Sequence, residues 1–170
     1  MPIFISQLIM SEENNGTAKK AGTAAVLVIG CAVGGLILLA VVGIVAAIAI
    51  PNFVSMQYKS KRAEIPMNLK SIKTAQIMYE QDFDTFVPAA MYPPYPTKTT
   101  NMWIKSASGG FEVIDFQPDG DVRGAYWVEV SANNFTATGI SDVDGDGVYA
   151  TYVATKSENP NSPITAPDIY

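Results

Sequence analysis

The sequence predicts an α+β fold in which a long N-terminal helix is followed by a small antiparallel sheet. Three observations lead to this prediction. A continuous apolar run covers residues 24–50, and apolar residues then recur at helical spacing over residues 65–83. Beyond residue 120, short alternating runs are separated by turn signals. We expect the first half of the helix to span a membrane and its second half to cover one face of the sheet.

The composition excludes several functional classes. The chain has 170 residues, with 16 acidic and 11 basic side chains, no histidine and one cysteine. A histidine-based catalytic triad, a zinc site of the usual Cys/His type and a disulfide within one chain are therefore excluded. An acidic chain is poorly suited to phosphate contacts, so we expect no nucleic-acid partner. No nucleophile–base pair is visible either, and the sequence predicts a protein that is not an enzyme, with no catalytic residues.

The charge distribution and the periodicity divide the chain into four segments. Residues 64–170 hold fourteen acidic and six basic side chains, and they are enough for one small globular domain. The predicted segments are a polar flexible N-terminal part (1–20), a transmembrane and assembly helix (21–53), a continuation of that helix (54–84), and a sheet domain with an Asp-rich hairpin and an irregular tail (85–170).

The membrane span is predicted from the absence of charge over residues 21–58. The apolar run at residues 24–50 exceeds the roughly 20 residues that a helix needs to cross the hydrocarbon core. It also exceeds the roughly 7–15 apolar residues of a cleaved signal peptide. Membrane lipid is therefore an expected partner. Two basic residues precede the run (Lys19 and Lys20) and three follow it (Lys59, Lys61 and Arg62). This small excess slightly favours a cytoplasmic location for the C-terminal side.

The segment after the apolar run is predicted to continue as helix. Pro51 removes one backbone hydrogen bond and is expected to kink the helix rather than end it. Pro66 predicts a second bend near Ile65. The apolar residues that follow are spaced by three or four positions, which indicates one face that covers a sheet. These residues are Ile65, Leu69, Ile72, Ala75, Tyr79 and Phe83.

The remainder of the chain is predicted as an irregular stretch followed by strands. Residues 84–108 are rich in proline and aromatic residues, and we favour a loop that lays its aromatic rings over the domain. A ligand for a proline-binding module is the alternative. Residues 111–116 are predicted to be extended, and Asp119-Gly120 is a turn signal. The three predicted strands lie at residues 125–130, 135–140 and 148–154.

The Asp-rich run at residues 142–147 is the sharpest chemical motif. Asp142, Asp144 and Asp146 alternate before glycines, as in the first half of a calcium-binding loop. The twelfth position is Val153 rather than a glutamate, so the run is not a standard EF-hand. Two interpretations remain: a hairpin loop that holds calcium, with Asp119 and Asp121 as further candidates nearby, or a plain acidic β-turn.

The single cysteine, Cys31, follows Gly30 inside the apolar run. The local pattern is similar to a bacterial lipoprotein signal, in which Cys31 would be lipidated. However, the run continues for about twenty residues beyond Cys31, which favours an ordinary membrane cysteine.

Residues 43–53 closely resemble the end of the membrane helix in type IV pilins and pseudopilins. Residues 59–64 and 68–76 are similar to the continuation of the pilin helix, and the resemblance extends over residues 36–84. It implies a pilin-like roll whose helix packs into the core of a filament, with Pro51 at a kinked or melted stretch. It also implies a bacterial inner-membrane protein with a cytoplasmic N-terminus and an extracytoplasmic sheet domain, partnered by itself or by other pilin-like subunits. Some secretion pseudopilins hold calcium near their C-terminal end. The resemblance therefore implies a candidate calcium site at Asp142, Asp144 and Asp146.

The N-terminal part departs from the family pattern. On the family's spacing the cleavage glycine falls at Ile29, one place before Gly30, and the acidic residue falls at Gly34. Two functional hypotheses follow. The first is a structural subunit of a type IV pilus or a type II secretion pseudopilus, processed near Gly30. The second is a membrane-anchored binding module that does not polymerise, with an intact or Cys31-lipidated N-terminus.

Overall fold

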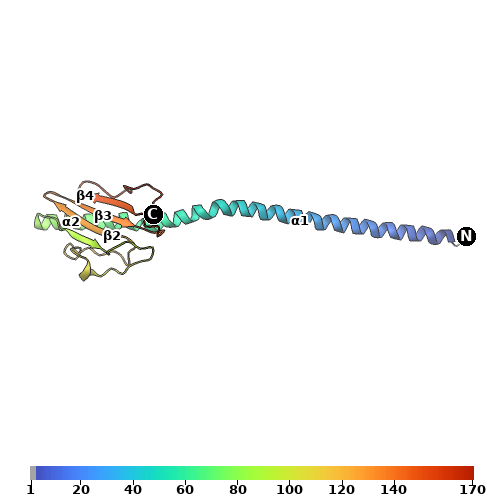
Figure 1. Cartoon of the computed structure of the whole chain (residues 1–170), viewed down its shortest axis with the longest axis horizontal. Coiled ribbons are helices and arrows are strands. Elements are labelled where there is room, and N and C mark those ends of the chain that lie inside the picture. The colour runs from blue at the N-terminus through green and yellow to red at the C-terminus, as the bar shows by residue number, and fades with distance from the viewer. Residues whose placement is uncertain (1–2) are drawn as a thin grey trace. The chain divides into compact units, whose positions relative to one another are not determined.

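The computed structural model describes the backbone of residues 3–170 and the side chains of residue 26 and residues 28–170. Its element order is α+β, as the sequence predicts (Figure 1). The contacts divide the chain after Asn52, and Phe53–Tyr170 forms one compact unit. The elements are α1 (Ile3–Arg62), α2 (Glu64–Phe83), β1 (Ala89–Tyr92), the short 3-10 helix η1 (Lys105–Ala107), β2 (Ala125–Ser131), β3 (Asn134–Ser141) and β4 (Ala150–Thr155).

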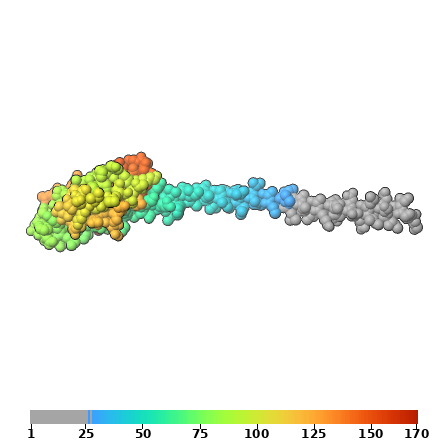
Figure 2. Space-filling model, turned by 90° about the horizontal axis from the view of Figure 1, so that it is seen from below, coloured from blue at the N-terminus to red at the C-terminus, as the bar shows by residue number. Residues whose placement is uncertain are grey.

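Helix α1 carries the apolar run and continues through Pro51 without a break in its secondary structure. The large apolar side chains between residues 28 and 50 keep 50% to 69% of their surface exposed. Figure 2 shows these residues, coloured blue to teal, uncovered on the face in view. They point in every direction around the helix, so α1 has no single face that a sheet could cover. The kink expected at Pro51 stays a prediction.

The helical stretch is interrupted at Ala63, between α1 and α2. Helix α1 ends at Arg62, α2 begins at Glu64, and the Ala63 N–H donates to the Lys59 carbonyl at 3.1 Å. Pro66 is the third residue of α2. A proline in the first turn of a helix sacrifices no intrahelical hydrogen bond. The helical stretch is therefore interrupted at Ala63, and the bend expected near Ile65 stays a prediction.

Helix α2 lies against one face of the sheet and packs on β3 and β4 (Figure 1). The predicted stripe is confirmed at Ile65, Leu69 and Ile72, which expose no surface. The prediction is wrong for Phe83, whose side chain is 62% exposed. Phe83 is the last residue of the helix, and its ring stacks on Tyr79 at 4.4 Å instead of entering the core.

The stripe includes a polar residue that the periodicity does not predict. Gln76 is fully buried in α2. Its Nε2 donates to the Val87 carbonyl at 2.6 Å and its Oε1 accepts from the Val87 N–H at 3.0 Å. Both backbone polar groups of the half-buried Val87 are thereby satisfied. Gln76 thus fixes the chain that leaves α2 and enters β1.

The sheet is antiparallel, with the strand order β1-β2-β3-β4. β2 pairs with β3 from Ala125 opposite Ile140 to Ser131 opposite Asn134. β3 pairs with β4 in the same way, with Ser141 opposite Ala150. The three predicted strands are confirmed, although β4 begins at residue 150 rather than 148.

Two predictions for the middle of the chain are wrong. The segment 84–108 contains β1, which adds an edge strand beside β2. Residues 111–116 are a series of turns rather than an extended segment. The apolar residues Phe111, Val113 and Phe116 misled the prediction there, because Val113 is exposed and the buried Phe111 and Phe116 are held by turns.

The loop interpretation of the aromatic residues is confirmed around Trp103, which is buried in the core. Its ring centroid lies 4.9 Å from that of Tyr92 and 5.5 Å from those of Phe111 and Phe116. Such tilted and edge-on contacts are favourable between aromatic rings. The irregular segments therefore supply a substantial part of the core, and α2 and the strands supply the rest.

Candidate functional site

The Asp-rich loop joins β3 to β4 and brings three predicted side chains together. One carboxylate oxygen from each of Asp142, Asp144 and Asp146 lies within 4.8 Å of the others. Among the described residues, Asp119 and Asp121 do not belong to this group. Val153 lies in β4, in agreement with a hairpin loop rather than an EF-hand.

The loop is shaped by its own backbone. Asp142 Oδ1 accepts from the Gly145 and Asp146 N–H groups at 2.8 and 3.1 Å, and Oδ2 accepts from the Gly147 N–H at 3.2 Å. Gly145 and Gly147 have φ angles of 77° and 82°, which favour glycine. The loop geometry therefore needs no ion, because Asp142 organises the turn by side-chain to backbone hydrogen bonds.

Asp144 provides the observation that fits a cation. Its Oδ1 is buried and has no hydrogen-bond partner among the described residues. A buried carboxylate oxygen without a partner is unfavourable by about 1–3 kcal/mol or more. Lys98 Nζ is nearby but donates to the Asp144 backbone carbonyl at 3.0 Å. A hard cation such as calcium, which prefers oxygen ligands, would satisfy the unpaired oxygen.

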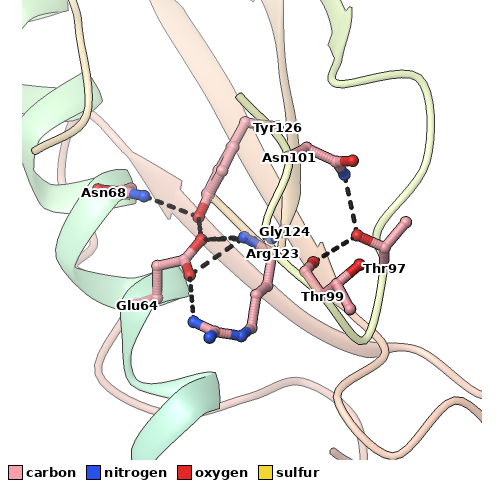
Figure 3. A network of polar contacts seen from close by, with 8 residues as sticks. All are labelled: Glu64, Asn68, Thr97, Thr99, Asn101, Arg123, Gly124 and Tyr126. Carbon is pink, nitrogen blue, oxygen red and sulfur yellow. Dashed lines mark hydrogen bonds and ion pairs between the residues drawn. The ribbon is translucent and has the colours of Figure 1, made fainter. Parts of the chain in front are cut away.

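A second polar cluster, which sequence reasoning missed, joins the start of α2 to the sheet (Figure 3). The Glu64 carboxylate accepts from the Arg123 N–H at 2.9 and 3.1 Å, from the Gly124 N–H at 3.3 Å and from the Tyr126 hydroxyl at 3.0 Å. Asn68 Nδ2 donates to the same hydroxyl at 2.8 Å. No local signal in the sequence pairs Glu64 with residues about 60 positions away.

This cluster acts on the protonation of Tyr126. Burial raises the pKa of the Tyr126 hydroxyl well above its usual value, and the negative charge of Glu64 raises it further. The hydroxyl therefore stays protonated and keeps donating to the carboxylate. The arrangement supplies a structural anchor, because every oxygen is committed to a partner within the fold.

The irregular tail is held by Arg62, at the end of α1. Arg62 is buried, and its Nη1 donates to the carbonyls of Pro167 and Ile169. Its guanidinium lies 5.2 Å from the centroid of the Tyr170 ring. Sequence analysis placed Arg62 among the flanking charges, but the structure gives it a role in fixing the tail.

The longest apolar surface is that of α1. The structure has one helical stretch, Val28–Phe83, that is long and apolar enough to cross a membrane, among the residues that it describes. At about 1.5 Å per residue, the apolar run measures about 40 Å, against a hydrocarbon core of about 30 Å. Gly30, Cys31 and Gly34 all lie on this stretch, and Cys31 is exposed and unpaired. Processing at Gly30 and lipidation at Cys31 stay predictions.

Comparison with known proteins gives one informative relative. The chain is 36% identical over 81 residues to the type IV major pilin protein PilA of Myxococcus xanthus (strain DK1622). The match covers 46% of this chain and 37% of that relative, so it spans less than half the length of either protein. No protein-family model matches the chain, and no solved structure matches it. The predicted resemblance to type IV pilins is confirmed.

Proposed function

We propose that this protein is a pilin-like structural subunit that is inserted in the bacterial inner membrane and assembles through α1 with further pilin-like subunits. One observation carries the proposal: the apolar side chains of residues 28–50 are exposed all around a helix in a chain that is similar to a major pilin. Such a surface is stable only against lipid or against other apolar helices. The role is structural rather than enzymatic.

The proposed topology has a cytoplasmic N-terminus, a single membrane pass and an extracytoplasmic sheet domain. The helix carries no ionisable side chain except Cys31 from residue 21 to residue 57, and Gly34 stands where the pilin resemblance implies a carboxylate. Crossing the membrane therefore involves no buried carboxylate. Assembly would depend on the packing of aliphatic and small residues, including Gly30, Gly34 and Gly43.

The absence of a carboxylate at Gly34 also favours the second candidate function. In that alternative the protein is a membrane-anchored module that does not polymerise, held by the intact helix or by a lipid on Cys31. The two candidates differ in the fate of the N-terminus and in the fraction where the protein is found.

The deciding experiment combines the intact mass and the N-terminal peptide with the cellular fraction. The structural-subunit proposal expects a chain trimmed near Gly30 in filaments sheared from the cell surface. A full-length chain found only in the membrane would replace it with the non-polymerising module. A lipid-bearing Cys31 would move the protein to the lipoproteins, and Cys31→Ser is the matched variant for that outcome.

We also propose that Asp142, Asp144 and Asp146 hold a calcium ion together with backbone carbonyls of the same loop. The unpaired Asp144 oxygen supports this proposal. Three carboxylates on an exposed hairpin suggest an affinity in the roughly 10⁻⁴–10⁻³ M range of extracellular modules. Calcium titration of the detergent-solubilised protein by calorimetry tests it, with Asp144→Asn expected to abolish the heat of binding.

A further inference from the structure

A groove lined by both apolar and polar side chains lies beside α2 in the compact unit Phe53–Tyr170. It has a volume of about 570 Å³ and is bounded by the outer side of α2 and by residues 113–117. Met78, Phe83 and Val113 line it, and their side chains are 62%, 62% and 51% exposed. Three large apolar side chains that converge on one hollow and stay exposed indicate a surface that another molecule covers.

At one end of the groove, Asp82 lines it and Asp84 directly follows the lining residue Phe83. Asp82 lies in the last turn of α2 and Asp84 is its C-cap, and this last turn contains no basic residue. A helix C-terminus already carries a partial negative charge, so two carboxylates there are unfavourable without a cation. Neither side chain has an ion pair with another described residue, whereas the neighbouring Glu80 is paired with Lys156 at 2.6 Å.

The backbone conformation at two acidic residues, Asp84 and Asp115, also bears on the charge beside the groove. Among the described residues, the non-glycine positions with positive φ are Asp84 and Asp115, both at 54°. Asp115 lines the groove and pairs with Lys105. Glycine or asparagine is the usual choice for a left-handed helix cap. Acidic residues at these two positions concentrate charge beside the groove, with no partner for Asp84 in the part of the chain that is described.

The complementary surface is present on the chain itself. Most lysines of the compact unit have partners in the fold: Lys73 with Glu158 and Asn159, Lys98 with Asp144, Lys105 with Asp115, and Lys156 with Glu80. Lys70 lines the groove, and Lys61 lies over the Tyr58 ring. Lys59 remains exposed, without an ion pair to another described residue.

Lys59 also has apolar neighbours on its helix face. Phe53 and Met56 are 62% and 68% exposed. The spacing of three residues places Phe53, Met56 and Lys59 within about 120° of the helix circumference. Two exposed apolar side chains followed by a lysine match a groove that offers Met78, Phe83 and Val113 next to Asp82.

We propose that the groove beside α2 binds the Phe53–Lys59 segment of a second copy of this chain, with Met56 against Met78 and Lys59 against Asp82. This contact rests on the proposed filament function and gives it a defined subunit interface. Lys59 and Asp82 are 23 residues apart in the sequence, or roughly 35 Å along the helices. Two parallel copies in this contact are therefore offset along the helix axis by about that distance.

The offset has a consequence for where the contact forms. About 35 Å exceeds the roughly 30 Å thickness of the hydrocarbon core. Copies that lie at the same depth in one membrane cannot make the contact. It forms only between axially staggered copies, as in an assembled filament, and not between neighbours that wait in the bilayer.

Cysteine cross-linking tests the contact in the full-length protein in its native host. In a Cys31→Ser background, one chain carries Met56→Cys and Met78→Cys, and a short thiol cross-linker is added to sheared filaments and to membranes. We expect a ladder of multimers in the filaments and none in the membranes. The matched control carries Met56→Cys and Met102→Cys, because Met102 is 71% exposed and lies outside the groove.

The outcomes separate this contact from the filament function on which it rests. Filaments that form normally but give no ladder, or an equal ladder in the control, overturn the contact alone. Absence of the wild-type protein from every filament fraction overturns the proposed function as well. A charge exchange adds a second readout: Asp82→Lys should reduce the ladder about two- to fivefold, and adding Lys59→Asp should restore it.

Discussion

Helices α1 and α2 follow each other in the chain but are stabilised in opposite ways. Between residues 28 and 50, α1 exposes apolar side chains in all directions. Helix α2 concentrates its apolar residues on one face, where Ile65, Leu69 and Ile72 are fully buried against the sheet. The difference shows that α2 finds its partner within the chain, whereas the apolar part of α1 stays uncovered among the described residues, where our proposal places lipid or other subunits.

The largest expected effect breaks the packing of α2. Leu69→Ala should lower the free energy of unfolding by about 2–5 kcal/mol, because it opens a cavity at a fully buried site. Thermal unfolding of the detergent-solubilised protein, followed by near-UV circular dichroism, measures it. Met67→Ala on the exposed side of α2 is the control and should change stability by about 0.5 kcal/mol or less. Equal effects would mean that α2 does not depend on the sheet.

The next change breaks the environment of α1. Ile44→Lys places a charge in the middle of the apolar run and should oppose membrane insertion by about 2.5–3.5 kcal/mol. Membrane flotation measures the loss, with Ile44→Leu as the conservative control. The unfolding midpoint of the sheet domain should stay unchanged, since residue 44 lies outside the unit Phe53–Tyr170. A lower unfolding midpoint of the sheet domain together with normal membrane insertion would contradict the different roles of α1 and α2.

A pH experiment sharpens the account of how α2 is anchored. The raised pKa of Tyr126 means that the folded protein keeps a proton that the unfolded chain releases above about pH 10. Stability from this group is therefore complete below pH 10 and falls above it by up to about 1.4 kcal/mol per pH unit. Urea unfolding at pH 9 to 11 should show a weaker decline for Tyr126→Phe. Parallel declines in both proteins would mean that Tyr126 does not contribute.

The smallest expected effect concerns the loop beyond β3. At a calcium concentration ten times the dissociation constant, the wild-type protein should gain about 1.4 kcal/mol of stability. Asp144→Asn should abolish the gain and Asp119→Asn should keep it. Calcium should raise the unfolding midpoint of the sheet domain without changing membrane insertion through α1. An equal response in both variants would identify the loop as a plain acidic turn.

The predictability of each element follows from the distance over which its signal acts. The apolar run of α1, the stripe of α2 and strands β2, β3 and β4 are encoded by neighbouring residues, and all were predicted. Strand β1 was missed because its pairing with β2 joins residues more than 30 positions apart. Residues 111–116 were misassigned because Phe111 and Phe116 are buried in turns, which local sequence patterns do not distinguish from a strand.

The candidate sites also differ in whether their signal is local in the sequence. The carboxylates at Asp142, Asp144 and Asp146 were predicted because turn residues and metal ligands share a short motif. The anchor at Glu64, the tail contact of Arg62 and the groove beside α2 were not predicted. Each depends on groups that are close only in the folded chain: the Arg123 and Gly124 amides, the Ile169 carbonyl, and the outer side of Met78.

The sequence by itself determined the helical periods, the apolar span, strands β2, β3 and β4, and the acidic loop. The physical reason is that backbone propensity and side-chain hydrophobicity act over a few residues. The tertiary structure alone decided which polar groups pair, which aromatic residues fill the core around Trp103, and which apolar side chains stay exposed beside α2. Those choices depend on packing and desolvation between distant segments, and such interactions exist only once the chain has folded.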